Sequence, residues 1–490
     1  MASSIQGLNS TYVSMINSAM KKARESKNQL EQEKSNLKNR KNVLSDLDSK
    51  LSTFNTQVEK LNDNIINQFD VMKAESSDSD LFTASAGSNA NIGSHSISVD
   101  RLATEDTRVS NVYTSSSENF SNITSDQTFS IQVAHPTEDN PNNRKNIDVT
   151  ITADTFSKNN EEVVSKIAEK INNAMNSAVT DDKIADGETV QASVVSQTEG
   201  NSRLVLSSSS KGYKHRINFS DSSSNLLSQL GVNNNTKATD SSGGYITEIG
   251  TNPENSQLNS KFQVDGLNFY RSSNEVKNAI QGVTLNLKQT FSKSENLEVN
   301  TDTEAVQKKV TNFIDKYNKT LDFLKNKTQI NPDGENGTLS SDMTYRNMEL
   351  NLRNTMISSI STANNEEYNS LRDIGIEVED DGKLSLDDKD KFNNALKEDP
   401  ANVGQVFRSE DGIANRLSSY LDRYIDTGGM IQDSKQNISN NINRIEDDIY
   451  SEKQRLTEKK RRLRNKYARV QKMMKSIQSQ QKYLSLFSSR

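Results

Sequence analysis

The chain has 490 residues and no cysteine; 31% of its residues are hydrophobic, and its net charge is −6. The length predicts about three or four domains, and the low hydrophobic content excludes one large compact core and favours long helices with small modules. The missing cysteines exclude disulfides, thiolate metal sites and cysteine nucleophiles, and the net acidity argues against non-specific nucleic-acid binding by the whole molecule.

The N-terminal 75 residues predict one long leg helix. The first twenty residues lack both the basic segment and the apolar core of a cleaved Sec signal, and no apolar run is long enough to span a bilayer, so we expect neither a cleaved signal nor membrane insertion. A strict seven-residue repeat then predicts a supercoiled partner helix. The repeat comprises Ile16, Ala23, Leu30, Leu37, Leu44, Leu51, Val58, Ile65 and Met72.

Residues 76–104 and 245–300 predict a discontinuous β head domain. Alternating apolar residues near 81–86 and 96–100 indicate two strands, and the turn pair Asp265-Gly266 indicates a hairpin. We expect Asn274 to cap a short helix through Ile280, followed by a strand that begins at Gly282, Val283 and Thr284.

Residues 105–244, which are rich in Ser, Asn, Asp and Thr, predict an inserted variable β/α head domain. Short apolar alternations indicate thin sheets or loops, and apolar residues between 163 and 174 have the spacing of one helix. Residues 301–430 then return to the helical period and predict a helical bundle with a β-hairpin near residues 374–386.

Residues 431–490 predict the returning leg helix. The two terminal helices could each pair with a copy or a foreign partner, but mutual pairing explains why everything else lies between them. We therefore predict an α+β multidomain chain, with a terminal α-helical coiled-coil leg and helical bundle carrying inserted, mainly-β head domains. The seam of the returning helix comprises Ile442, Ile449, Leu456, Leu463, Val470, Ile477 and Leu484.

Two features interrupt or surround this seam. Glu452 and Lys459 occupy d positions where an apolar residue is expected, which predicts locally weakened pairing and a seam able to exchange partners; a frayed bundle end is the alternative. Residues 453–475 are rich in Lys and Arg and could form a nucleic-acid or acidic-lipid patch. The heptad continues through them, however, and favours a solvated face or a surface for an acidic protein partner.

The sequence offers no candidate for catalysis. His95, His135 and His215 lie in separate segments without metal-ligand spacing and are interpreted as loop residues. No nucleophile stands at a recognisable spacing from a base, and there is no Gly-rich phosphate loop. We therefore predict no enzyme activity, no cofactor and no metal.

The order of these segments resembles the bacterial flagellar filament capping proteins, the flagellar hook-associated protein 2 family. The resemblance covers nearly the whole chain, although residues 105–154 match nothing in it, and residues 156–232 resemble a flagellin-type module. The stretches that carry it are the N-terminal heptads with 81–86 and 99–103, the motif residues Asp265, Gly266, Asn274, Gly282, Val283 and Thr284, and the segments 313–318 and 382–387.

The resemblance implies an extracellular cap at the tip of the flagellum. Such caps leave the cell unfolded through the flagellar type III apparatus without a cleaved signal and form a homo-oligomeric ring. The ring helps exported flagellin to fold and insert during filament growth. Export chaperones and hook–filament junction proteins are further implied partners. A leg of about 55 helical residues would span roughly 80 Å, long enough to reach several subunits deep.

Two other functions remain open from the sequence. The β head could serve cell adhesion by binding host mucin or glycan, which is compatible with capping. The chain could also be an intracellular coiled-coil scaffold, in which case it would stay in the cytoplasm of a cell with an intact flagellar export apparatus.

Overall fold

The computed structural model describes residues 7–63, 68–221, 225–332, 334–361 and 367–487, and the chain divides into two compact units. Unit 1 combines Met1–Asp70 with Thr303–Arg490, and unit 2 is Val71–Asp302. Unit 1 is mainly helical and unit 2 is mainly β. The predicted α+β class, with long terminal helices and a mainly-β interior, is confirmed. Among the helices of the described ranges, none is long and apolar enough to cross a membrane.

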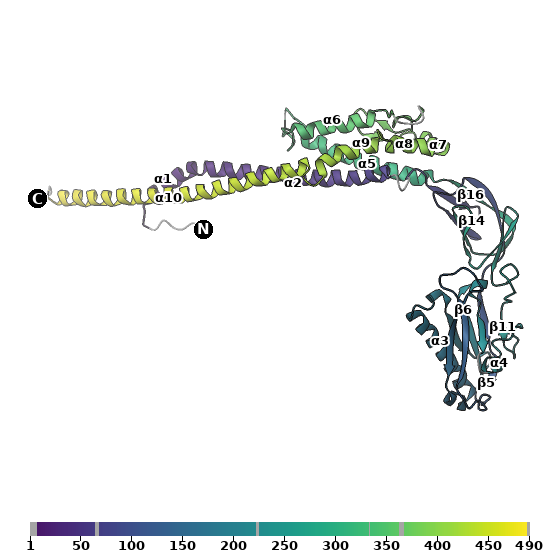
Figure 1. The fold of residues 1–490 in the computed structure, drawn as a ribbon. Coiled ribbons are helices and arrows are strands. Elements are labelled where there is room, and N and C mark those ends of the chain that lie inside the picture. The colour runs from purple at the N-terminus through teal and green to yellow at the C-terminus, as the bar shows by residue number, and fades with distance from the viewer. Residues whose placement is uncertain (1–6, 64–67, 222–224, 333, 362–366, 488–490) are drawn as a thin grey trace. The chain divides into compact units, whose positions relative to one another are not determined.

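Unit 1 contains an antiparallel leg made from both ends of the chain. Helices α1 (Ser10–Ala23) and α2 (Glu25–Asn62) lie beside α10 (Met430–Phe487), drawn purple and yellow in Figure 1. Residues 9, 34 and 48 contact residues 471, 446 and 435 of α10, respectively, so the numbering falls along α10 as it rises along α1 and α2. The helices therefore run in opposite directions. The two ends of the chain therefore pair with each other.

The N-terminal leg helix differs from its prediction at two places. A slight irregularity at Arg24 divides it into α1 and α2, although Arg24 keeps helical backbone angles and its N–H still donates to the Met20 carbonyl, and it ends at Asn62 rather than near residue 75. Ile65 lies outside the described residues. Met72 begins a strand, so the predicted helical repeat is wrong at Met72. Met72 pairs with Thr301 across a sheet, and this distant partner overrides the local period.

A helical bundle packs against α2 and the first part of α10. Buried aromatic rings join leg and bundle: the Phe54 ring of α2 lies 5.6 Å from that of Phe313 and 5.9 Å from that of Tyr317, between centroids. A two-stranded hairpin completes the bundle, as predicted. Its elements are α5 (Thr303–Thr328), α6 (Met343–Ile357), β17 (Glu377–Val378), β18 (Leu384–Ser385), α7 (Lys389–Glu398), α8 (Pro400–Arg408) and α9 (Ile413–Ile425).

The part of unit 2 nearest in sequence to the leg is a β domain, here called the inner head module. It combines a five-stranded antiparallel sheet, in the order β1-β16-β3-β12-β13, with a three-stranded sheet, β14-β15-β2, over one apolar core. The strands are β1 (Met72–Ser76), β2 (Phe82–Ala86), β3 (Gly93–Arg101), β12 (Ser260–Val264), β13 (Leu267–Arg271), β14 (Glu275–Ile280), β15 (Val283–Leu287) and β16 (Phe291–Thr301).

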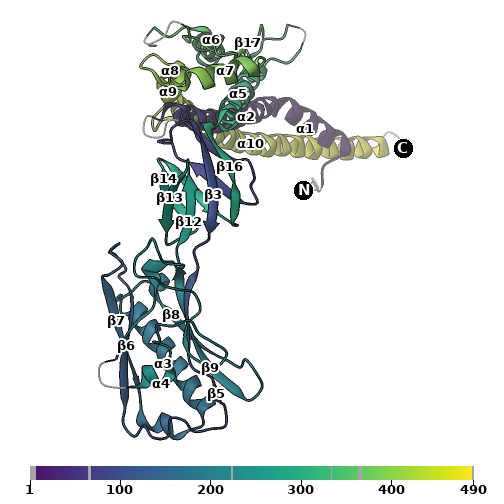
Figure 2. The same ribbon diagram turned by 90° about the vertical axis from the view of Figure 1, so that its right-hand side faces the viewer.

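The remainder of unit 2, the outer head module, wraps two sheets around one long helix, α3 (Asn160–Thr180), as Figure 2 shows. The α3 face that carries Val163, Ile167 and Ile171 is buried in the module core. The other elements are β4 (Glu105–Val109), β5 (Tyr113–Thr114), β6 (Gln127–Ala134), β7 (Arg144–Ile151), η1 (Ala153–Ser157), η2 (Asp186–Glu188), β8 (Val190–Val195), β9 (Asn201–Lys211), η3 (Tyr213–His215), β10 (Asn218–Asp221), α4 (Leu226–Leu230) and β11 (Gly244–Tyr245).

Candidate functional site

Polar contacts along the leg fix how the two terminal helices align. The Lys435 ammonium lies 3.1 Å from the Asp48 carboxylate, and the Lys34 ammonium lies 2.6 Å from that of Glu446. The hydrogen bond from Lys34 is the main reason why the pKa of Glu446 is lowered. Solvent screens exposed pairs of this kind, so they select the register while the apolar seam supplies most of the stability.

The predicted seam residues are buried to different degrees along the leg. The inner positions are shielded because α2 and α10 pack on each other and on the bundle, whereas the α10 positions beyond α1 have little cover. Buried members are Leu44, Leu51, Val58, Ile442, Ile449 and Leu456; half-buried members are Leu30, Leu37 and Leu463; exposed members are Val470, Ile477 and Leu484; Ile65 lies outside the described residues.

The far end of the leg has an apolar cluster of its own. We call α1 together with residues 453–487 of α10 the distal leg. There Ile16, Met20 and Ala23 of α1 bury Leu456, and the Tyr12 ring stacks on the Tyr467 ring with centroids 5.4 Å apart. The cluster joins α1 to α10 through few residues and is separate from the larger bundle core.

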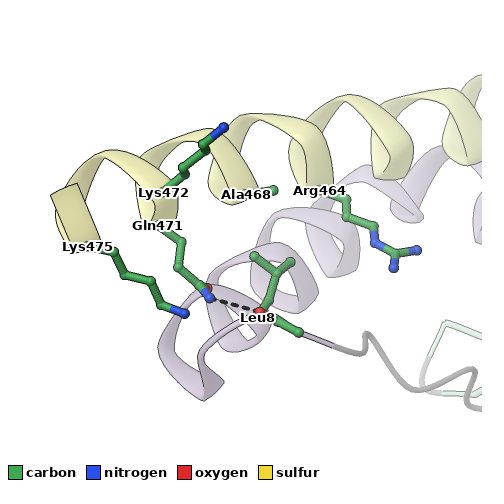
Figure 3. Close-up of a pocket in the computed structure, with 7 residues that line it drawn as sticks. Leu8, Arg464, Ala468, Gln471, Lys472 and Lys475 are labelled. Carbon is green, nitrogen blue, oxygen red and sulfur yellow. Dashed lines mark hydrogen bonds between the residues drawn. The ribbon is translucent and has the colours of Figure 1, made fainter.

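A glutamine of α10 holds the residues that lead into α1, whose N-cap is Asn9. Gln471 Nε2 donates to the carbonyl oxygen of Gly7 at 2.8 Å, and Gln471 Oε1 accepts from the backbone N–H of Asn9 at 2.9 Å. Figure 3 shows Gln471 between Arg464 and Lys475, beside a cavity of about 330 Å³. Sequence reasoning missed this contact, because a glutamine on a polar helix face carries no signal of its partner.

The surface of the distal leg is strongly cationic. Residues 453–475 include eleven Lys and Arg and one Glu, and all eleven except the half-buried Lys459 are exposed. Val470, which is 37% exposed, lies within this basic stretch, and Ile477 and Leu484, which are 38% and 69% exposed, continue the apolar row beyond it. The arrangement suits a partner that presents both apolar and acidic side chains.

The two polar residues at d positions lie partly inside the leg. The Glu452 side chain is only 11% exposed, and its carboxylate accepts two hydrogen bonds from Arg455, one of them 2.6 Å long. This contact is the main reason why the pKa of Glu452 is lowered. Lys459 is half-buried. The seam between Ile449 and Leu456 therefore contains a charged residue that is satisfied from its own helix.

The predicted motif of the head begins with a tight turn between β12 and β13. Asp265 and Gly266 both have positive φ angles, 51° and 80°, as the two-residue hairpin turn requires. Asp265 Oδ1 accepts from the N–H of Ser96 at 2.8 Å, and Asp265 Oδ2 lies 2.7 Å from His95 Nδ1. His95 was interpreted as a loop residue, but it lies in β3, where it helps to tie the hairpin to the neighbouring strand.

The second half of the motif corrects one prediction. Residues after Asn274 form strand β14 rather than a short helix, because β15 pairs with them. Asn274 instead clamps the backbone of Ala103: its Oδ1 accepts from the Ala103 N–H at 2.6 Å, and its Nδ2 donates to the Ala103 carbonyl at 3.2 Å. Ala103 lies just before the chain enters the outer head module, so Asn274 fixes this crossing.

The remaining motif residues form the β14–β15 turn and the start of β15. Gly282 has a φ of 71°, and a Cβ there would lie 2.6 Å from the Ala90 nitrogen, so only glycine fits. Val283 is buried in the inner core, and Thr284 pairs with Ser85 of β2. The motif residues therefore stabilise turns and strand pairing in the inner head module. They belong to unit 2, whereas the seam residues belong to unit 1.

None of the described residues forms a group of three or more His, Asp or Glu side chains suited to a metal ion. His135 lies after β6 and His215 within η3, as separate positions in the outer head module. The chemistry offered by the described side chains is thus that of packing surfaces: an apolar seam, a basic helix surface and rigid turns.

The fold and these surfaces define a structural protein with two units: a helical one whose long antiparallel leg is built from both chain ends, and a mainly β one inserted between them in the sequence. Residues 10–106 match the family model of the flagellar hook-associated protein 2 N-terminus, and residues 258–479 match that of its C-terminus. The chain belongs to the flagellar hook-associated protein 2 family, which is a family of structural flagellar cap proteins.

Known relatives match over different lengths. The flagellar hook-associated protein 2 of Escherichia coli K12 is 25% identical over 454 residues, 90% of this chain and 87% of that protein. The A-type protein of Pseudomonas aeruginosa is 29% identical over 195 residues, which cover 38% of this chain and only 40% of that protein. The crystal structure of the D1-D2-D3 domains of the flagellar cap protein FliD from Escherichia coli has a TM-score of 0.59 and 26% identity, and covers 81% of this chain and 99% of that one.

The Asp265 turn yields a pH-dependent prediction. The hydrogen bond from His95 holds the pKa of Asp265 below its usual value, so the stabilisation by this carboxylate is present near neutral pH and is lost as the pH falls through that lowered pKa. Because the pair is partly exposed, we expect Asp265→Asn to lower the unfolding free energy of the inner head module by at most about 1 kcal/mol at neutral pH.

Thermal unfolding of the full chain and of the variant, at neutral pH and near pH 2, measures this effect. The gap between the two melting temperatures should close in acid. A gap of the same size at both pH values would mean that the carboxylate charge plays no part.

Proposed function

We propose that this chain is the structural cap at the distal tip of the bacterial flagellar filament. It forms a homo-oligomeric ring outside the cell and promotes the folding and insertion of exported flagellin. The observation that carries the proposal is the antiparallel pairing of α1 and α2 with α10, because it builds one rod from both chain ends and leaves the head modules as an insertion. Family membership supports the same function.

The leg is the part that contacts flagellin in this proposal. With 58 residues, α10 spans roughly 87 Å, enough to reach deep into a helical filament. The exposed apolar row of Val470, Ile477 and Leu484 suits an amphipathic helix of flagellin as it folds. The polar lapse at Glu452 weakens the seam next to the separate α1 cluster, so that the distal leg can exchange its own helix for a flagellin helix.

The proposed function implies further partners, both during export and at the junction between hook and filament. The chain reaches the tip through the flagellar type III apparatus without a cleaved signal. An export chaperone and the junction proteins are its further contacts. The basic surface of residues 453–475 supports an acidic protein partner, because repulsion between like charges disfavours the pairing of two copies of this segment with each other.

Deletion of the gene in a flagellated host tests the proposal. The cells should keep their hooks, make no long filaments and shed flagellin monomers into the medium. Expression of the intact chain should restore filaments. Normal filaments in the deletion strain would refute the cap function.

The exchange hypothesis predicts a gain in stability with a loss of function. Replacing Glu452 and Lys459 together by leucine fills both d positions with apolar side chains, so we expect the leg helices to melt at a higher temperature while filament growth slows. Circular dichroism and filament length measure the two effects.

The matched control exchanges exposed charges of the same helix, Glu458→Leu with Lys460→Leu, which should leave leg stability nearly unchanged. Unchanged stability together with normal capping in the Glu452 and Lys459 double variant would count against the exchange hypothesis.

A further inference from the structure

A short segment of the outer head module makes non-covalent contacts with the inner head module. These contacts add to the two places where the chain itself passes between the modules. We call residues 212–216 the junction segment. The Tyr213 N–H donates to Asn259 Oδ1 at 2.8 Å, and Asn259 Oδ1 also accepts from Ser272 Oγ at 3.1 Å. Gly212 has a φ of 89°, and a Cβ there would lie 2.3 Å from the Ser272 Cα. The junction segment therefore contacts the inner head module at backbone distance.

Behind the junction segment the outer head module buries more positive than negative charge. Arg108 and Arg216 are buried and Arg144 is half-buried, while Asp106 is the one fully buried carboxylate among the described residues of this region. Asp106 accepts from the Ile217 N–H at 2.7 Å and from Arg108 Nε at 3.2 Å. Its oxygens are thus already engaged.

The guanidinium groups hold the junction segment through its carbonyl oxygens. Arg144 Nη1 donates to the Lys214 carbonyl at 2.7 Å, and Arg144 Nη2 donates to the Arg216 carbonyl. Arg216 Nη1 donates to the Tyr213 carbonyl at 3.0 Å, and its guanidinium carbon lies 4.0 Å from the centre of the Tyr213 ring. The segment is therefore held by cations.

His215 is the residue of this segment whose ordinary pKa, 6.5, lies nearest to neutral pH. Its Nδ1 is buried and has no hydrogen-bond partner among the described residues. Burial, with Lys214 and Arg144 close by, lowers the pKa of His215 to about 4. A second ring proton would add a buried donor without an acceptor and a charge beside two cations.

The surrounding elements supply no carboxylate free to neutralise that charge. Asp106 is engaged by Arg108 and the Ile217 amide, and the exposed Asp139 binds the Lys214 ammonium at 2.8 Å. β6 contributes the uncharged Gln132, and the inner head module contributes the uncharged Asn259 and Ser272. The charged and titratable groups of the described residues around His215 are Lys211 at the end of β9, Tyr213, Lys214 and Arg216 of the segment itself, Arg144 of β7, Asp139 before β7, and Asp106 and Arg108 of β4.

We propose that the junction segment is an acid-sensitive latch, in which protonation of His215 releases the segment and frees the outer head module to move relative to the inner one. The latched arrangement disfavours the proton, so it is fully stable above the ordinary pKa of His215, 6.5, and weakens as the pH falls towards 4. Across this window the ratio of latched to released molecules falls by up to about 300-fold.

Distance measurements on the full chain test the latch. Because the sequence has no cysteine, the double variant Asn173→Cys and Lys293→Cys can carry one spin label on each head module, at exposed positions. The distance distribution should be narrow near pH 7.5, broaden reversibly as the pH falls through about 6 to 4.5, and narrow again on neutralisation. A distribution that stays narrow down to pH 4.5 would overturn the proposal.

Variants at His215 assign the transition. His215→Gln cannot be protonated and should keep the narrow distribution in acid, whereas His215→Lys carries a permanent charge and should broaden it already at pH 7.5. His95→Gln, a histidine of the inner head module, is the matched control and should behave as the unmodified chain. If His215→Gln broadens in acid as the parent does, the transition belongs to another group, such as Asp106, and the latch is disproved. Far-UV circular dichroism selects the variants that fold; if His215→Gln does not, His215→Asn takes its place.

Discussion

Replacing Phe54 by alanine is expected to lower the free energy of unfolding of unit 1 by about 3–5 kcal/mol. The Phe54 side chain is fully buried on α2, and its ring packs against those of Phe313 and Tyr317 on α5. Truncation removes this apolar contact and leaves a cavity where the leg meets the bundle. Urea denaturation of the full chain, followed by far-UV circular dichroism, measures the loss.

Phe323→Ala is the matched control, because Phe323 lies on the same α5 helix but is only half-buried. Its ring faces the ammonium of Lys50 at 5.4 Å, an exposed cation–π contact that contributes on the order of 0.5–1 kcal/mol. We expect this substitution to cost clearly less than Phe54→Ala. Equal losses for the two variants would contradict a central packing role for Phe54.

The terminal helices could be predicted from the sequence because hydrophobic spacing is a local property. Leu44, Leu51 and Val58 repeat every seven residues and are all buried. The same period fails at Met72, which lies in β1 opposite Thr301. A strand partner so far along the chain leaves no trace in the local pattern, so the helix was extended too far.

The head motif shows the same limit at one residue. An asparagine before an apolar pattern is a common helix cap, and the local sequence after Asn274 allows a helix. The residues after Asn274 form strand β14 because they pair with β15. The Asn274 side chain binds the backbone of Ala103 instead of capping a helix. The hairpin turn at Asp265-Gly266 could be predicted because it needs positive φ angles at two successive residues, and an Asp-Gly pair adopts them readily without help from distant residues.

Buried polar clusters could not be predicted at all. Asp106, Arg144 and Arg216 belong to different strands and loops, and each taken alone reads as an ordinary surface charge. Only the folded outer head module brings them together around the junction segment. In the same way, nothing near Gln471 in the sequence indicates that it holds the residues that lead into α1.

A covalent lock between α1 and α10 is expected to abolish capping. In the exchange hypothesis α1 must leave Leu456, Leu463 and Tyr467 when a flagellin helix arrives. Tyr12→Cys with Tyr467→Cys puts one thiol on each helix, at residues whose native rings stack with centroids 5.4 Å apart, and the chain contains no other cysteine to mispair. A thiol-reactive cross-linker with a reducible internal bond should join the two cysteines, which a mobility shift on a non-reducing gel detects, and filament growth should stop.

Reduction should restore growth, since the chain itself is unchanged. A second pair, Lys34→Cys with Glu446→Cys, takes the same cross-linker and spans α2 and α10 at residues that form an ion pair 2.6 Å long in the native chain. This pair lies outside the α1 cluster, which is the part that opens in the exchange hypothesis, so its lock should leave capping intact. If both locks stop growth equally, or neither does, the separate α1 cluster is not the element that exchanges. Selective loss with the Tyr12 and Tyr467 pair would place the exchange at the far end of the leg, where the apolar cluster of α1 stands apart from the bundle core.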